Sequence, residues 1–201
     1  MKSIIIPYSD RLELPDEKTL SVDIYKWVDN SYRPKVDVYL CHNNKKLKIK
    51  IVSYEKHDDV GIKYNKDNQA VYCDSCVEFF IKPYSDNRYV NFEINPSGAM
   101  IMSLNKEKGD SKVLVFKYKP ILNLITNQTP YLWYAQFEIP FESLAEIYEQ
   151  SNSIQSGDKI RGNFYKCGDE TKYPHYGMWN EIPDGCVSFH QPEYFGELIL
   201  E

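Results

Sequence analysis

The sequence predicts an all-β fold, an antiparallel β-sandwich of the immunoglobulin or jelly-roll kind, with one short helix around residues 141–150. Apolar and polar residues alternate with a period of two through many short segments, which is the pattern of strands that are buried on one face. Only one stretch carries its apolar residues at helical spacing. Many short strands with a single helix are typical of two sheets packed against each other.

The clearest strand is 46–51, in which leucine and isoleucine alternate with lysine. We expect it to pair with 36–41 through a short turn, and we expect 76–82 to pair with 88–95 in a second hairpin. Further segments have the composition of strands: 98–104, 112–118, 131–139, 158–166 and 196–200.

The one predicted helix begins directly after Pro140, and proline is favoured near helix starts. Its apolar residues recur at positions that share one side of a helix, namely Phe141, Leu144, Ala145 and Tyr148. We expect a short helix that packs on a β scaffold.

The composition fits one folded domain, residues 1–201, and excludes several classes of protein. The chain has 24 basic and 29 acidic residues, a net charge of −5, and 42% of its residues are hydrophobic. That hydrophobic content is enough for a core and too high for a disordered chain. No apolar run approaches the ~18 residues that span a bilayer, and an acidic chain lacks the basic footprint of a nucleic-acid binder. We therefore expect neither a membrane nor a nucleic acid as a partner. The 17 tyrosines are unusual, and their half-polar rings suit a ligand cleft.

One polar sheet face is predicted from the alternation of side chains along the second hairpin. Glu78, Asn91 and Glu93 point away from the apolar side of their strands. Two registers stay open, one with Glu78 opposite Glu93 and the other with Glu78 opposite Asn91. Carboxylates that face each other repel, so we expect a compensating group nearby, and Arg161 is the candidate.

Two later strands extend this face with an amide and the guanidinium group. The resulting mixture of donors and acceptors suits neighbouring sugar hydroxyls: Glu78, Asn91, Glu93, Gln136, Arg161 and Asn163. An ordinary solvated sheet face is also polar, and this alternative stays open. Such a face, however, would be dominated by lysine, serine and threonine.

The segment 165–195 is loop-like and dense in aromatic residues, proline, glycine and histidine. Long loops without secondary structure of their own often carry function. Tyr176 and Trp179 are candidates for rings that cover the C–H face of a sugar, although Trp179 could instead anchor the loop to the sandwich. We expect Trp27 and Trp133 to serve in packing.

The five cysteines are an odd number, which favours reduced thiols over a disulfide framework. Cys73 and Cys76 form a C-x-x-C pair, but zinc needs a second pair, and Cys41 with His42 is only a loose candidate. We therefore assign no metal ligands and expect partly buried free cysteines. The N-terminal apolar stretch ends at Pro7 and is too short for a signal peptide. The chain as written is thus expected in the cytoplasm, and outside the cell only if an export signal has been removed.

Five short motifs, in the same order along the chain, resemble family 9 carbohydrate-binding modules. Each motif alone is weak, but together they span roughly residues 20–201. The motifs are 74–80 (DSCVEFF), 89–98 (YVNFEINPSG), 137–144 (FEIPFESL), 161–165 (RGNFY) and 192–198 (PEYFGEL).

The resemblance implies a β-sandwich that binds sugars, often at a chain end, between two aromatic rings. One ring of these modules lies just upstream of the strand glutamate, where Tyr72 replaces the tryptophan often found there. Trp179 is the best match for the second ring and Tyr176 the next. The hydrogen-bonding residues that carry over are Glu78, Gln136, Arg161 and, less directly, Asn91 and Asn163. Members can also hold structural calcium, but the sequence has no dense Asp/Asn loop of the kind calcium favours, so we assign it no ligands and expect no cofactor.

The favoured function is therefore non-catalytic binding of a mono- or oligosaccharide, and two alternatives stay open. The first is a glycan-processing enzyme or an accessory protein of glycoside hydrolases, which these modules usually accompany. An enzyme could use Glu78 and Glu93 as a glycosidase pair, or Cys167 with His175 and Asp169 for nucleophilic attack. The second is an interaction module that has lost sugar binding, in which case we expect the cleft to be filled.

Overall fold

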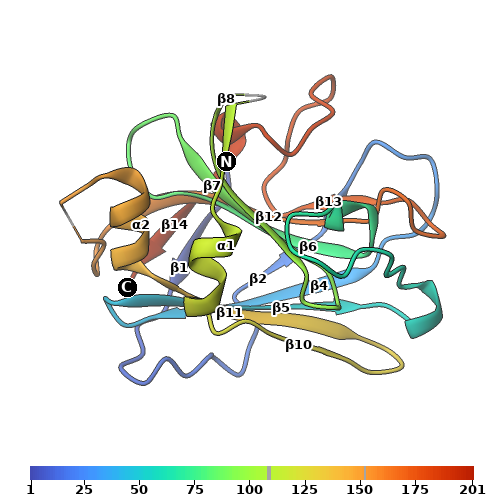
Figure 1. Ribbon diagram of the computed structural model, residues 1–201, viewed down its shortest axis with the longest axis horizontal. Coiled ribbons are helices and arrows are strands. Elements are labelled where there is room, and N and C mark those ends of the chain that lie inside the picture. The colour runs from blue at the N-terminus through green and yellow to red at the C-terminus, as the bar shows by residue number, and fades with distance from the viewer. Residues whose placement is uncertain (108–109, 152) are drawn as a thin grey trace.

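The structure, a computed structural model, describes residues 1–107, 110–151 and 153–201, and it is a sandwich of two β-sheets (Figure 1). The predicted all-β sandwich is confirmed. The larger sheet consists of β1 (Ser3–Ile6), β14 (Gly196–Leu200), β12 (Lys159–Cys167), β6 (Cys76–Lys82), β7 (Tyr89–Ile94), β8 (Met100–Glu107) and β9 (Asp110–Val113), in this order, with β13 (Tyr176–Met178) paired to β12 and β3 (Ile24–Tyr25) paired to β13. The smaller sheet has the order β10 (Ile125–Gln128), β11 (Trp133–Pro140), β5 (Lys46–Tyr54), β4 (Lys35–His42) and β2 (Leu20–Val22).

Both predicted hairpins are present, as β4–β5 and β6–β7. In the alternating segment of β5 the apolar residues are buried and the lysines are partly exposed, because successive side chains of a strand point to opposite faces. The pairing between strands is antiparallel with one exception among the named strands, since β1 runs parallel to β14. The sequence analysis predicted neither β1 nor this parallel pair.

Aromatic rings fill the space between the two sheets. Phe79 of β6 stacks on Phe164 of β12, with ring centroids 4.4 Å apart. Phe92 of β7 meets Phe137 of β11 across the two sheets at 5.6 Å. Trp133 is fully buried, as predicted. Large rings each bury a large apolar surface, so they contribute strongly to this core.

The predicted helix is α2 (Phe141–Tyr148). Pro140 has an extended backbone at its start, and Glu149 adopts the left-handed conformation at its end, with φ 56°. The backbone N–H of Glu149 donates to carbonyls of the last turn, which closes the helix. Short 3₁₀ turns complete the described helical segments: η1 (His57–Asp59), η2 (Val71–Cys73), η3 (Lys119–Ile121) and η4 (Pro192–Tyr194).

The strand predicted over 112–118 is wrong in its second half. The strand β9 ends at Val113, and the helix α1 (Val115–Tyr118) follows. Leu114, Val115 and Tyr118 are buried while Phe116 is exposed, so the apolar run buries one side of a helical turn rather than alternate residues. A continuous apolar run does not distinguish these two arrangements.

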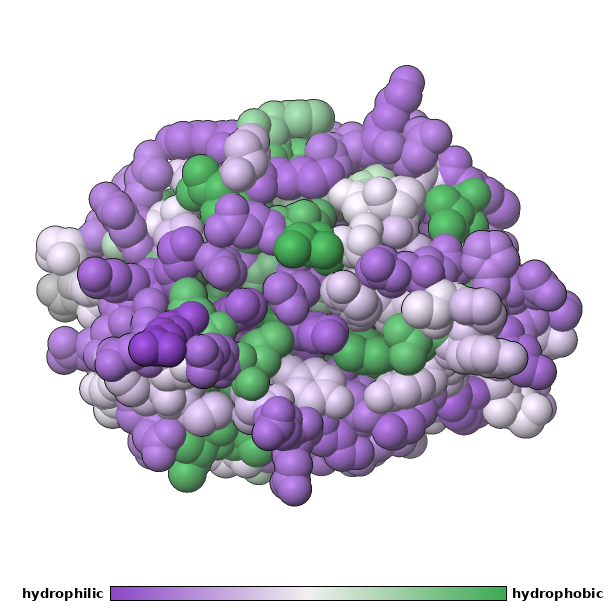
Figure 2. Space-filling view, turned by 90° about the horizontal axis from the view of Figure 1, so that it is seen from below, coloured by the Kyte–Doolittle hydropathy of each residue, from purple (hydrophilic) through white to green (hydrophobic). Residues whose placement is uncertain are grey.

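The outer face of the smaller sheet is exposed to solvent. Figure 2 shows the molecule from the side that is lowest in Figure 1, and its surface is mostly hydrophilic with separated apolar patches. In the part of the chain that the structure describes, no helix combines the length and the apolar content that crossing a membrane requires.

Candidate functional site

A cavity of about 650 Å³ opens over the outer face of the larger sheet. This volume lies within the roughly 300–1,000 Å³ of small-molecule pockets. Trp27, Tyr72 and the loop 187–190 contribute to its walls. Its floor is built by β6, β7, β8 and β12, which contribute Glu78, Asn91, Glu93, Ser103, Asn105 and Cys167.

Two carboxyl groups face each other on the cavity floor. Glu78 of β6 and Glu93 of β7 are register partners, which is one of the two registers that the sequence left open. They are only 3% and 4% exposed. Burial raises the pKa of Glu93 to about 7, and burial together with Cys167 and Glu93 raises the pKa of Glu78 well above its ordinary value. The pair therefore retains protons near neutral pH and can donate as well as accept hydrogen bonds.

The groups that hydrogen-bond to this carboxyl pair are neutral, and the nearby Asp169 carboxyl group further raises the pKa of Glu93. Asn105 Nδ2 donates to Asn91 Oδ1 at 2.9 Å, and Asn91 Nδ2 donates to Glu93 Oε1 at 2.6 Å. Cys167 Sγ donates to Glu78 Oε1 at 3.0 Å. The described lining residues include no lysine or arginine. Cys76 lies beside Glu78 and Cys167, so three potential metal ligands meet here.

Aromatic rings form much of the cavity wall. The Trp27 ring lies 5.2 Å from that of Phe189 and 5.9 Å from that of Tyr176, measured between centroids. The Phe189 ring is fixed from below by Tyr165, on which it stacks at 4.2 Å. Tyr72 keeps 40% of its surface exposed. The indole Nε1 of Trp27 is buried and has no hydrogen-bond partner within the described part of the chain.

The structure brings five of the predicted binding residues together at this cavity and places four elsewhere. Those at the cavity are Tyr72, Glu78, Asn91, Glu93 and Tyr176. Those elsewhere are Gln136, Arg161, Asn163 and Trp179. Contact between the first five and a sugar stays a prediction.

Gln136 and Arg161 were predicted on the face that forms the cavity floor, and neither lies there, for different reasons. Gln136 belongs to β11 of the smaller sheet, so its outward side chain lies on the opposite side of the sandwich from the cavity. Arg161 lies in β12, but its Nη2 donates to the carbonyls of Phe195 and Glu193 at 2.7 and 2.9 Å. The compensating cation expected beside the carboxyl pair is therefore engaged at the other end of its strand.

Asn163 and Trp179 are buried by the C-terminal loop. Asn163 points to the predicted face of β12, yet its Nδ2 donates to the Asn180 carbonyl and its Oδ1 accepts the Asn180 N–H, both at 2.9 Å. Trp179 is 4% exposed and packs against Phe164 in the core. The expectation of a stacking role for Trp179 is corrected to the anchoring alternative. Trp27, which we expected to serve in packing, does pack against buried apolar residues and also lines the cavity.

The sequence analysis gave no binding role to several cavity residues: Trp27, Ser103, Asn105, Cys167, Asp169, Phe189 and His190. The alternation along β8 could have found Ser103 and Asn105, because Ser103 is the register partner of Asn91. Trp27 offers no such signal, since it lies in a loop and has a left-handed backbone with φ 72°.

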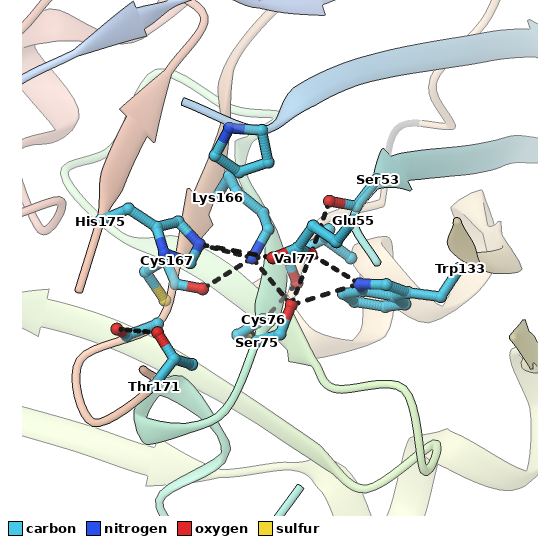
Figure 3. Close-up of polar contacts among 12 residues, drawn as sticks. Ser53, Glu55, Ser75, Cys76, Val77, Trp133, Lys166, Cys167, Thr171 and His175 are labelled. Atoms are coloured by element: carbon cyan, nitrogen blue, oxygen red, sulfur yellow. Dashed lines mark hydrogen bonds and ion pairs between the residues drawn. The ribbon is translucent and has the colours of Figure 1, made fainter. Parts of the chain in front are cut away.

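A second polar cluster lies between the sheets, behind β12 and the start of β6 (Figure 3). This inter-sheet cluster consists of Glu55, Ser75, Trp133, Lys166 and His175. Lys166 Nζ is fully buried and lies 3.3 Å from Glu55 Oε2. The groups Ser75 Oγ and Trp133 Nε1 donate to the same carboxylate oxygen at 2.7 and 2.8 Å.

The charges of the inter-sheet cluster are balanced. Burial alone would raise the pKa of Glu55, but Lys166 and the hydrogen bonds lower it to about 2. Burial, with Lys166 as the next cause, lowers the pKa of His175 to about 3. His175 Nδ1 therefore carries the proton and donates to the Tyr173 carbonyl at 2.7 Å, while Nε2 accepts from Lys166 at 2.8 Å. A carboxylate, an ammonium group and a neutral imidazole fill this space.

The inter-sheet cluster also argues against nucleophilic catalysis by Cys167. His175 binds Lys166 on the inner side of β12, whereas Cys167 points outward to Glu78. The cysteine and histidine that the sequence offered as one alternative thus lie on opposite faces of the sheet, and no activated thiol arises from them.

The comparisons with known proteins agree with this architecture. A sequence model of carbohydrate-binding family 9 matches residues 11–200. A candidate carbohydrate-binding protein from Bacteroides uniformis is similar over 100% of this chain and 99% of its own, with a TM-score of 0.84 and 24% identity. A family 9 module from Caldicellulosiruptor kristjanssonii was solved with glucose and with cellotriose. It is similar over 100% of this chain and 96% and 94% of its own in the two structures, with a TM-score of 0.67 and 14% identity. These likenesses show a shared fold. None of the curated proteins matches the chain.

Proposed function

The chain belongs to carbohydrate-binding family 9, and we propose on this basis that residues 1–201 form one non-catalytic module that binds a mono- or oligosaccharide in the cavity. The observation that carries the proposal is the cavity itself, which joins aromatic walls to a floor of carboxyl and amide groups. A sugar presents both complementary surfaces, because its ring has weakly polar C–H faces and a rim of hydroxyls.

The aromatic walls supply the stacking surface. Tyr72 is the most exposed of the three rings named here, and Trp27 and Tyr176 lie on another part of the wall. Covering these rings with C–H groups removes apolar surface from water. Trp27 thereby takes the role that the sequence resemblance gave to Trp179.

The floor supplies the hydrogen bonds. Asn91 and Glu93 are two residues apart on one face of β7, and Asn105 lies beside them on β8. Glu78 faces them from β6. Carboxyl groups that hold protons and amides that both donate and accept match hydroxyls, which also do both. Neighbouring hydroxyls of one sugar are therefore the expected partners of these side chains.

A glucose-type sugar is the first candidate ligand. The Caldicellulosiruptor module was solved with glucose and with cellotriose, and the present cavity has room for a small sugar. We expect a dissociation constant between about 1 mM and 1 µM, or roughly −4 to −8 kcal/mol, because a small polar ligand gives up well-hydrated hydroxyls when it binds.

The two alternatives fit the cavity less well. An interaction module that has lost sugar binding would have a filled cleft, whereas this cavity has a volume of about 650 Å³. A glycosidase needs one of its two carboxyl groups ionised to act as nucleophile or base, whereas burial raises the pKa of both Glu78 and Glu93. An accessory role beside a glycoside hydrolase agrees with the proposal, since a binding module relies on an enzyme to act on its ligand.

Calorimetric titration tests the proposal. The panel is glucose, xylose, galactose, cellobiose, xylobiose and a reduced disaccharide alcohol, each titrated into wild type, Tyr72→Ala and Trp27→Ala. Gln136→Ala is the matched control, because Gln136 shares the polar character of the site but lies on the other sheet. We expect saturable heat with at least one sugar, and a loss of about 2- to 10-fold in affinity for each ring variant.

The titration results distinguish the proposed sugar-binding module from the alternative functions. Binding of cellobiose without binding of its reduced alcohol indicates recognition of a chain end. An equal loss in Gln136→Ala and in the ring variants contradicts the placement of the site. No heat from any sugar at millimolar concentration overturns the proposed function and favours an interaction module.

A further inference from the structure

Three potential metal ligands converge on the cavity floor: the thiols of Cys76 and Cys167 and the carboxyl group of Glu78. One donor atom of each lies within 4.8 Å of the other two. The side chains are 0%, 2% and 3% exposed. Among residues 1–107, 110–151 and 153–201, this is the one group of three or more His, Cys, Asp or Glu side chains whose donor atoms all lie within 4.8 Å of one another.

The sheet itself fixes this convergence. Cys76 and Glu78 are two residues apart in β6, so their side chains leave the same face. Cys167 of β12 is the register partner of Cys76. Two donors on one strand and a third on its hydrogen-bonded neighbour form a triangle whose corners are held by backbone pairing. A site built on strands is positioned more accurately than one built on loops.

We propose that Cys76, Glu78 and Cys167 bind a thiophilic divalent cation, for which Zn²⁺ is the best match. Two thiolates and a carboxylate are ligand types that Zn²⁺ accepts, whereas Ca²⁺ and Mg²⁺ prefer oxygen ligands throughout. The sequence analysis assigned no metal ligands because it sought the partners of Cys76 in Cys73, Cys41 and His42. Cys41 and His42 belong to the smaller sheet.

The fourth ligand position faces the cavity. Glu78 and Cys167 both line the cavity, while Cys76 is enclosed behind them. Three protein ligands leave one position of a tetrahedral Zn²⁺ for water or a ligand oxygen, which is the arrangement of an open zinc site. The ion would therefore lie where the floor of the proposed sugar site meets the sheet.

Metal binding exchanges protons for the ion. In the metal-free protein Cys76 Sγ donates to the Val77 carbonyl at 3.7 Å, and Cys167 Sγ donates to Glu78 and to the Tyr72 carbonyl at 3.0 and 3.6 Å. Both thiols and the Glu78 carboxyl group lose their protons when they coordinate the cation, and the three released protons pass to buffer. No electron transfer takes place.

Titration of the reduced, metal-free protein with Co²⁺ tests the proposal. Co²⁺ replaces Zn²⁺ in tetrahedral sites, and its thiolate-to-metal absorption reports sulfur ligands directly. We expect one Co²⁺ per chain, an absorption typical of two thiolates, and displacement of Co²⁺ by Zn²⁺. The readout does not involve sugar, so failure of the proposed function leaves this test intact.

Single variants identify the ligands. Cys76→Ser and Cys167→Ser should each lose about half of the thiolate absorption. Loss of a residue that only supports a ligand weakens metal binding by about 10- to 100-fold, and loss of a ligand itself should weaken Co²⁺ binding by more than this. Glu78→Gln should keep the thiolate absorption and bind more weakly. Cys41→Ser is the control, since Cys41 is a buried free cysteine of the smaller sheet, and it should behave as wild type.

X-ray absorption of Zn²⁺-loaded wild type gives a second test that does not depend on folding of a variant. We expect two sulfur atoms at about 2.3 Å and oxygen neighbours at about 2.0–2.2 Å. Absence of the thiolate absorption, its loss in Cys41→Ser, or a Zn²⁺ shell without sulfur overturns the proposal. So does a Cys76–Cys167 disulfide in the isolated protein with no metal uptake after its reduction.

Discussion

The cavity floor and the inter-sheet cluster meet at β12 and at the start of β6, and they differ in charge balance. In β12, Lys166 points into the inter-sheet cluster and Cys167 points into the cavity, because neighbouring side chains of a strand alternate. Ser75 and Cys76 divide in the same way at the start of β6. Two polar sites therefore lie back to back, separated by one layer of backbone.

The inter-sheet cluster neutralises its carboxylate with an ammonium group, and solvent is excluded from both. The cavity floor has two facing carboxyl groups, and its described lining residues include no lysine or arginine. A buried polar cluster that is balanced and closed serves the fold, whereas one that is unbalanced beside an opening indicates a ligand. Four variants test this distinction.

Lys166→Met should have the largest effect, because it leaves Glu55 as an unpaired buried charge. The free energy of unfolding in urea should fall by about 3–5 kcal/mol. Lys172→Met is the matched control, since Lys172 makes a solvent-exposed ion pair with Asp59 at 3.2 Å, and it should leave stability nearly unchanged. Similar losses in the two variants would contradict the structural role of the inter-sheet cluster.

Acid should weaken the inter-sheet cluster through His175. Its pKa is about 3 in the folded protein and about 6.5 in the unfolded chain. The unfolded chain therefore takes up a proton first as the pH falls, and stability is lost from about pH 6.5 downward toward pH 3. His175→Gln keeps an acceptor for Lys166 but does not titrate, so between pH 6.5 and 5 it should lose about 1.5 kcal/mol less than wild type. Parallel profiles of unfolding free energy against pH would exclude this origin.

Glu93→Gln examines the cavity floor, where the sign is reversed. The pKa of Glu93 is raised to about 7 in the folded protein and is about 4.3 in the unfolded chain, so its ionisation opposes folding and stability is lost as the pH rises from about 4.3 to about 7. In the metal-free protein the advantage of the variant over wild type should grow by about 1 kcal/mol between pH 6 and pH 7. An equal gain at both pH values, measured by urea unfolding, would mean that burial of the charge is not the cause.

Asn105→Ala should have the smallest effect and should act on binding rather than on folding. It removes the amide that donates to Asn91 Oδ1 and leaves both carboxyl groups in place. Affinity for the best-binding sugar should fall about 2- to 10-fold, which corresponds to one hydrogen bond of about 0.5–1.5 kcal/mol. Calorimetry measures this loss, and an unchanged affinity would remove Asn105 from the site.

Alternation within one hairpin was enough to predict the centre of the candidate site. The faces of Glu78, Asn91 and Glu93 follow from a period of two, and the turn left only two registers. The same reasoning failed for Gln136, because alternation gives the face of a strand but not the sheet to which the strand belongs. Assignment to a sheet depends on pairing between segments that are distant in sequence.

The two tryptophans show a second limit of prediction from sequence. Trp179 and Trp27 both lie in or beside irregular segments, where the local sequence does not show which ring is buried in the core and which lines the cavity. Tertiary packing decides this. Gly196 leaves room for the Trp179 ring, and a side chain at that position would collide with it. Lys166 illustrates the same limit, since lysine is almost never fully buried unless it is paired. Its partner Glu55 comes from the other sheet and becomes visible only in the folded chain.

The parallel pairing of β1 with β14 determines how the molecule responds to tension. Ser3 pairs with Glu197 and Ile6 with Leu200, so the chain enters at one end of this strand pair and leaves at the other. A pull on the two ends in opposite directions slides the strands along each other, and all of the evenly spaced hydrogen bonds between them share the force. Antiparallel strands pulled from one end would instead separate one bond at a time. Tension applied between the two ends of residues 1–201 thus loads this strand pair in its mechanically stronger direction.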